Sequence, residues 1–174
     1  MNLLQKGLLF ATVAHGAVGQ IRKYSGVDYI VHPVGVKNIL IDFGFKDDIN
    51  LLVASLLHDV VEDTKIKFDL IEAEFNIDVA NLVFEVTNPS KQYPELNRKA
   101  RKTMDLEHLK SATKRGMALK LADVLFNTPD IIKEDPKFAK IWIPEAYKVV
   151  EVVKDGSEAL YAEAKWTLGL WSDK

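Results

Sequence analysis

Two short segments of the sequence combine imidazole, carboxylate and amide groups on an apolar background. Residues 58–64 read His-Asp-Val-Val-Glu-Asp-Thr, and residues 120–127 read Lys-Leu-Ala-Asp-Val-Leu-Phe-Asn. On a helix, positions i, i+1, i+4 and i+5 share one face, so the His-Asp and Glu-Asp pairs of the first segment would project into the same space. Ionisable groups clustered on an apolar helix are costly unless they are paired or bind a cation. The pattern predicts a metal site with acid–base groups beside it, which is typical of a hydrolase.

The predicted metal site draws its ligands from both segments and from one further histidine: His32, His58, Asp59 and Asp123. Two nitrogen and two carboxylate ligands without sulfur suit a divalent ion in roughly octahedral geometry, with water in the open positions. We expect Mn²⁺, with Fe²⁺ and Zn²⁺ as alternatives. A metal lowers the pKa of bound water enough to make a nucleophile near neutral pH. Glu62 and Asp63 would orient or deprotonate this water and protonate the leaving group, in an order that residue types do not decide.

Each of these residues also has an ordinary structural interpretation when it is taken alone. Asp123 could be a buried carboxylate paired with Lys120 or Arg115, and Asn127 could end a helix. A Glu-Asp pair at a helix end is commonly a solvated surface. The joint occurrence of all these features in one short helical chain favours the metal site.

The elements that must position these residues are helices, because helical periodicity dominates and strand patterns are hard to find. Helices are expected at residues 2–17, 33–44, from Asp47 or Asp48 through the His-Asp motif, 68–75, 78–87, 117–126, 145–153 and 157–171. Residues 19–29 and 88–94 are expected to be loops, with Thr128-Pro129 breaking the helix of the second segment. Basic residues 98–102 are expected on an exposed helix face. No linker or repeat divides the chain, so we expect one all-α domain over residues 1–174.

The composition narrows the function further. The chain has 174 residues, enough for one buried core, and its 48% hydrophobic and 28% charged content is that of a globular domain. A net charge of −2 gives no basic field, which argues against nucleic-acid binding. The absence of cysteine excludes disulfides, thiolate metal sites and cysteine nucleophiles. With no run of about 20 apolar residues and no signal-peptide pattern, we expect a cytoplasmic protein with no membrane partner.

These residues resemble the HD-domain phosphohydrolases, in particular the small alarmone hydrolases related to the hydrolase domain of RelA/SpoT proteins. The stretches that carry the resemblance lie in family order at residues 14–16, 19–26, 29–33, 56–64, 86–87 and 120–123, with Asn127. The resemblance implies a helical HD-domain bundle and a Mn²⁺-dependent enzyme that removes the 3′-pyrophosphate of guanosine tetra- or pentaphosphate. Its partner would be a small nucleotide substrate.

The resemblance also implies roles for individual residues. It places His32, His58, Asp59 and Asp123 on the metal, and Glu62 with Asp63 as the catalytic acidic pair. It places the substrate contacts on Arg22, Lys23, Lys99 and Asn127, and an aromatic residue near the base at Trp142. A nucleotide with two pyrophosphate groups carries several negative charges, which guanidinium and ammonium groups would balance.

Two alternative functions stay open. Val124 and Thr128-Pro129 depart from the family pattern, so the chain could be an HD-type phosphatase or pyrophosphatase for another nucleotide, such as NADPH or a deoxynucleotide. It could also be a non-catalytic nucleotide-binding regulatory module. Such a module would be expected to lose Glu62 or Asp63, and this chain retains both.

Overall fold

The computed structural model describes residues 1–170, which form helices and turns with a single isolated β-bridge, Ile21 to Asp28. This confirms the predicted all-α class. The helices are α1 (Leu3–Ala17), α2 (Val31–Leu40), α3 (Ile49–Leu57), α4 (Val60–Asp63), α5 (Phe68–Glu74), α6 (Ile77–Val86), α7 (Arg98–Leu109), α8 (Lys114–Glu134), α9 (Pro136–Val152) and α10 (Glu158–Gly169). A π-helical turn (Ile41–Phe45) and two short 3₁₀ turns (Pro89–Gln92 and Lys154–Gly156) complete the described chain. None of these helices is long and apolar enough to cross a membrane.

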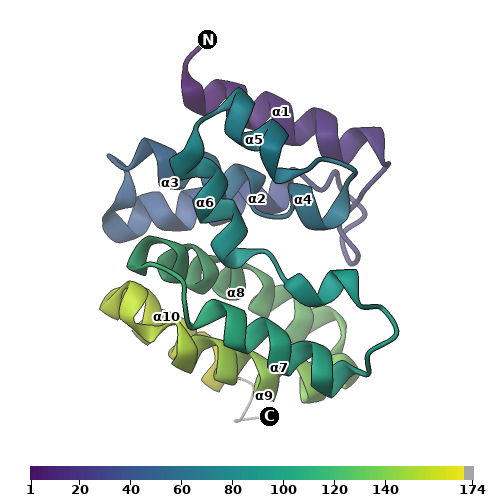
Figure 1. Cartoon of the computed structure of the whole chain (residues 1–174). Helices are drawn as coiled ribbons and strands as arrows, with labels where there is room; N and C mark the ends of the chain where they lie inside the picture. Colours follow the sequence, from purple (N-terminus) through teal and green to yellow (C-terminus); the bar gives the residue numbers. More distant parts are fainter. Residues whose placement is uncertain (171–174) are drawn as a thin grey trace. The chain divides into compact units, whose positions relative to one another are not determined.

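The chain divides into two compact units, residues 1–87 and the residues from Asn88 onward. In the first unit α3 is the central helix, packed against α1, α2 and α6 (Figure 1). Every side chain from Leu51 to Leu57 is buried, as expected for a helix that is apolar on all sides. The Asp48 side chain accepts a hydrogen bond from the Leu51 amide and so caps the start of α3; of the two candidates that the sequence offered, Asp47 and Asp48, the structure selects Asp48.

The His-Asp motif does not continue α3 as one helix. The helix ends at Leu57, His58 and Asp59 form a turn, and the four-residue α4 follows. The Asp63 amide still donates to the Asp59 carbonyl over 3.0 Å, so the turn preserves the i, i+4 spacing between the two acidic residues. The continuous helix predicted through this motif is therefore wrong, while the one-turn spacing that the chemistry needs is kept.

The loop between α1 and α2 is held by its own backbone hydrogen bonds. The Arg22 amide donates to the Val27 carbonyl over 2.8 Å, and the Tyr29 amide donates to the Gln20 carbonyl over 3.3 Å. Gly26 has a φ of +70°, a backbone conformation that side chains disfavour, and this allows the reversal between the two arms. These hydrogen bonds fix the positions of Gln20 and Tyr29 in the loop that precedes α2.

In the second unit α8 is the central helix, packed against α9, α10 and the 3₁₀ turn Lys154–Gly156 (Figure 1). It runs through Pro129 to Glu134, so the predicted break at Thr128-Pro129 is wrong. The neighbouring Thr128 hydroxyl donates to the Val124 carbonyl over 2.7 Å, and both Thr128 and Ile131, on either side of the proline, are buried, so tertiary packing holds the helix past Pro129. Helix α9 likewise passes through Pro144 and is longer than predicted.

Other predicted boundaries agree within a few residues. Helix α6 begins at Ile77 with Asn76 as its cap, one residue earlier than expected. Helix α10 begins after the Ser157 cap and ends at Gly169. Trp171, where the sequence placed the end of the last helix, lies outside the described residues.

Gly156 provides a test of the packing in the second unit. A Cβ atom at this position would meet the backbone of α8, including the Met117 carbonyl carbon at 2.6 Å, and backbone cannot move aside as a flexible side chain can. We expect Gly156→Ala to lower the free energy of unfolding by about 2 kcal/mol, measured by urea denaturation. Gly16→Ala is the matched control, because nothing lies within 4 Å of its Cβ position, and it should be neutral or slightly stabilising. Equal stability of the two variants would contradict the packing described here.

Candidate metal centre and the pocket of the second unit

Three side chains of the first unit bring one donor atom each to a common point. His32 lies in the first turn of α2, and His58 and Asp59 form the turn after α3. The His32 and His58 Nε2 atoms are 3.1 Å apart, and the Asp59 Oδ2 atom is 3.2 Å from the first and 3.1 Å from the second. Both imidazoles are buried, and the carboxylate is partly exposed.

The spacing and orientation of these donors fit a divalent cation. Neighbouring ligands of an octahedral ion with bonds of about 2.2 Å lie about 3.1 Å apart. The His58 Nδ1 atom is 2.8 Å from the Ser55 carbonyl, to which it can donate only as Nδ1–H. In the neutral ring this fixes the Nε2 lone pair toward the other two donors, as is usual for metal-binding histidines. Among the described residues, this group is the one cluster of three or more such side chains that could hold a metal ion.

The electrostatics of Asp59 favour its ionised form. Burial raises the pKa of the Asp59 carboxyl, but the adjacent His58 and His32 outweigh this effect and hold the pKa well below its usual value. The Tyr29 hydroxyl also donates to Asp59 Oδ2 over 2.6 Å. The atom nearest both imidazoles is thus a carboxylate oxygen oriented by a phenol.

The acidic pair of the first motif lies one turn further along the chain. Glu62 and Asp63 end α4 and are both half-buried. Asp63 Oδ2 accepts a hydrogen bond of 2.8 Å from the Gln20 amide nitrogen. The Gln20 oxygen lies 2.7 Å from Nδ1 of the buried His15. The α1–α2 loop therefore contacts both the metal-binding turn, through Tyr29, and the acidic pair, through Gln20.

Asp123 belongs to the second unit, on α8, where it is buried. Its Oδ2 atom accepts from Lys120 Nζ over 2.8 Å, and its Oδ1 atom accepts from the Asn127 side-chain nitrogen over 2.7 Å. These contacts are the ion pair that the sequence offered as an alternative to metal ligation. The assignment of Asp123 to the metal stays a prediction.

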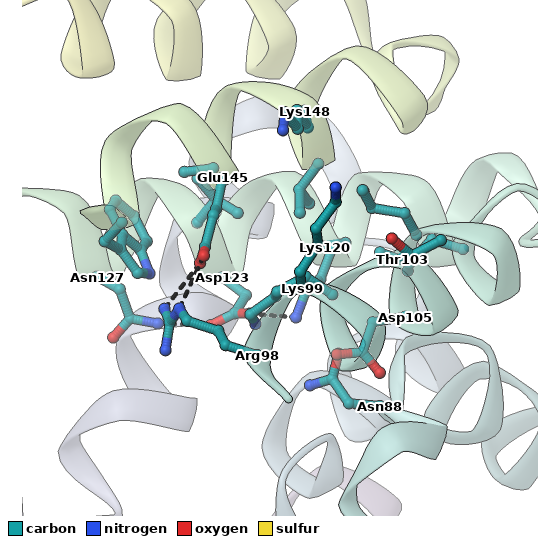
Figure 2. A pocket seen from close by; sticks show the side chains of 17 residues that line it. Asn88, Arg98, Lys99, Thr103, Asp105, Lys120, Asp123, Asn127, Glu145 and Lys148 are labelled. Carbon is teal, nitrogen blue, oxygen red and sulfur yellow. Dashed lines mark hydrogen bonds and ion pairs between the residues drawn. The ribbon is translucent and has the colours of Figure 1, made fainter. Parts of the chain in front are cut away.

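A pocket of about 450 Å³ opens beside Asp123 within the second unit (Figure 2). Of the residues that the sequence proposed for the substrate or the base, Lys99, Asn127 and Trp142 line it. The pocket is lined by five basic side chains, Arg98, Lys99, Lys102, Lys120 and Lys148. Three acidic side chains also line it, Asp105, Asp123 and Glu145. The lining therefore carries an excess of positive charge.

The acidic residues of this pocket are all engaged within the unit. Arg98 makes a two-bond pair with Glu145, with nitrogen–oxygen distances of 2.8 and 2.7 Å (Figure 2). Asp105 accepts from both the amide and the hydroxyl of Ser90. Burial lowers the pKa of Lys102, although the charge of Asp105 opposes this effect. The predicted exposed face at residues 98–102 is thus wrong for Arg101 and Lys102, which are both half-buried, and Lys102 also lines the pocket.

Arg22 and Lys23 lie in the α1–α2 loop of the first unit. Arg22 is half-buried, whereas Lys23 is exposed with its ammonium group 4.7 Å from the centre of the Tyr24 ring. Their assignment to the nucleotide stays a prediction.

No individual role was predicted for Gln20, Tyr29 or Lys102. Gln20 and Tyr29 lie in stretches that carry the family resemblance, but the sequence does not indicate that they form hydrogen bonds with Asp63 and Asp59. Lys102 sits in a basic run, and such a run by itself suggests a solvated helix face.

Comparison with known proteins decides the family. A model of the HD domain matches residues 8–140. The chain belongs to the HD-domain family. A solved structure of a metazoan ortholog of SpoT that hydrolyses ppGpp superposes on this HD domain with a TM-score of 0.85 and 29% identity, covering 96% of this chain and 94% of the other.

Curated relatives of this HD-domain protein are named for the same reaction. The guanosine-3′,5′-bis(diphosphate) 3′-pyrophosphohydrolase MESH1 of Xenopus tropicalis is 41% identical over 109 residues, which are 63% of this chain and 59% of the relative. The enzyme of that reaction name from Aquifex aeolicus is 30% identical over 98% of this chain and 22% of its own length. The match thus spans about three fifths of the Xenopus protein and about a fifth of the Aquifex protein.

The contact between Tyr29 and Asp59 yields a test of the metal site in this HD domain. Tyr29→Phe removes the hydroxyl that orients Asp59 and keeps the ring, so we expect Mn²⁺ affinity to fall about 10- to 100-fold. Isothermal titration of metal-stripped protein would measure it. Tyr24→Phe in the same loop is the control and should bind like the wild type. Equal affinities for the wild type and Tyr29→Phe would contradict a role for Tyr29 in orienting a ligand.

Proposed function

We propose that this HD-domain protein is a Mn²⁺-dependent hydrolase that removes the 3′-pyrophosphate of guanosine tetra- or pentaphosphate. The observation that carries the proposal is the convergence of His32 Nε2, His58 Nε2 and Asp59 Oδ2 within 3.2 Å. The reaction names of the relatives support the choice of substrate. The cytoplasmic location expected from the sequence stays a prediction.

In the proposed reaction, His32, His58 and Asp59 would hold the metal ion, and Asp123 would be the fourth protein ligand. When bound, the ion would act as a Lewis acid that lowers the pKa of its bound water and offsets negative charge on the phosphoryl oxygens. Glu62 and Asp63 accept a proton from the attacking water and return one to the 3′-oxygen of the leaving nucleotide. Tyr29 keeps Asp59 oriented throughout.

The pocket of the second unit supplies the chemistry for binding a polyphosphate. Lys99 and Lys102 line it together with Trp142, whose ring can stack on a purine base. An excess of ammonium groups suits pyrophosphate, and the partly buried Lys102 would gain most from an anion because it has lost part of its hydration. Arg22 and Lys23 would add contacts to the nucleotide from the loop.

The proposed activity is tested by turnover of metal-stripped protein with and without Mn²⁺. We expect release of pyrophosphate from guanosine tetraphosphate only when Mn²⁺ is added, and a loss of at least about 100-fold in kcat for Glu62→Gln. Glu72→Gln, an exposed site on α5, is the control. Parallel assays with NADPH and deoxynucleotides cover the alternative substrates. Turnover of NADPH or a deoxynucleotide in place of guanosine tetraphosphate would change the assigned substrate. Nucleotide binding without any turnover would favour a regulatory module.

Lys102 provides a separate test of substrate binding. Lys102→Met keeps the aliphatic stem and removes the charge, so we expect KM for guanosine tetraphosphate to rise about 10- to 100-fold with a smaller change in kcat. Lys110→Met is the control, because Lys110 lies on the same stretch of chain but pairs with the exposed Glu107. A KM for Lys102→Met equal to that of the wild type would exclude Lys102 from the binding site.

A further inference from the structure

The Gln20 side chain lies between a buried histidine and one carboxylate of the acidic pair. Its amide nitrogen is 2.8 Å from Asp63 Oδ2, and its oxygen is 2.7 Å from His15 Nδ1. An ionised carboxylate only accepts hydrogen bonds, so the group that faces Asp63 must be the amide NH₂. This orientation turns the amide oxygen toward His15, which must then donate through Nδ1–H.

A second observation assigns the same tautomer to His15. The side chain is 1% exposed, and its Nε2 atom has no hydrogen-bond partner among the described residues. A proton on Nε2 would leave a buried donor without an acceptor, which is costlier than a buried lone pair. Burial also lowers the pKa of His15, with the Gln20 bond and the charges of Asp59 and Asp63 opposing it, so the neutral ring is favoured. A neutral His15 with its proton on Nδ1 therefore locks the Gln20 amide in one orientation.

We propose that Gln20, locked by His15, is a positioning residue that fixes the rotation of the Asp63 carboxylate for proton transfer. This inference rests on the proposed function of Asp63 as part of the acidic pair. It gives the α1–α2 loop a role in the reaction besides nucleotide contact. Neither Gln20 nor His15 needs to touch the substrate for this role.

The loop connects this chain of hydrogen bonds with the metal-binding turn. The Tyr29 amide donates to the Gln20 carbonyl over 3.3 Å, and the Tyr29 ring packs against His15 with ring centres 4.7 Å apart. The Tyr29 hydroxyl in turn binds Asp59. Two adjacent arms of one loop thus orient one carboxylate of the metal site and one of the acidic pair.

The test compares variants that approximate the shape of each side chain and remove its hydrogen bonds. Gln20→Met should lower kcat for guanosine tetraphosphate about 30- to 100-fold, with KM and Mn²⁺ affinity within about 3-fold of the wild type. His15→Phe keeps an aromatic ring against Tyr29 and should lower kcat about 3- to 10-fold. Because both residues act through Asp63, the double variant should be no slower than Gln20→Met alone. Gln92→Met, at an exposed site in the second unit, is the control.

A spectroscopic measurement tests the same geometry without turnover. Long-range ¹H–¹⁵N spectra should show His15 as the neutral Nδ1–H tautomer in the wild type, and Gln20→Met should lose this signature. A wild-type kcat for Gln20→Met, or losses that multiply in the double variant, would overturn the inference while leaving the proposed function intact. An inactive wild-type protein would overturn the proposed function and the inference together.

Discussion

The structure of the first unit depends on the mutual repulsion of three electron-rich atoms, His32 Nε2, His58 Nε2 and Asp59 Oδ2. Two imidazole nitrogens and a carboxylate oxygen lie within 3.2 Å of one another beside the most deeply buried helix of the unit. Such a cluster is tolerable only if protons or a cation neutralise it. The surroundings favour the cation, because the backbone carbonyl of Ser55 engages the far side of the His58 ring and so turns its lone pair inward. The end of α3, the start of α2 and the loop before α2 can all be understood as supports for this one point.

Much of the structure of the first unit could be predicted from sequence, because its helices depend on local rules. An Asp cap before α3, the apolar run of α3 and the place of Pro33 in the first turn of α2 follow from capping, periodicity and the fixed φ of proline. The convergence of His32 with His58 and Asp59 was expected from residue types and from the family resemblance. The ligand atoms themselves, Nε2 in each histidine, required the structure.

The errors arose where tertiary contacts override local rules. A proline normally ends a helix, but α8 as a whole packs against α9 and α10, and Ile131 beyond Pro129 is buried. The same sequence rules treat basic runs as solvated, yet α7 turns Lys102 toward a pocket. The hydrogen bonds from Gln20 and Tyr29 to Asp63 and Asp59 join residues that are 43 and 30 positions apart, a separation at which local patterns carry no signal.

The position of the metal-binding turn at the end of α3 ties ion binding to the integrity of the core. An ion held by His32, His58 and Asp59 would connect the start of α2 to the end of α3, two helices that pack on each other. Because the unfolded chain does not assemble these ligands, binding adds to the stability of the folded state in proportion to the logarithm of ion concentration. The lifetime of the protein in a cell would then follow the supply of the metal. A low concentration of the metal would then lower the amount of folded protein, and the remaining molecules would lack their metal ion.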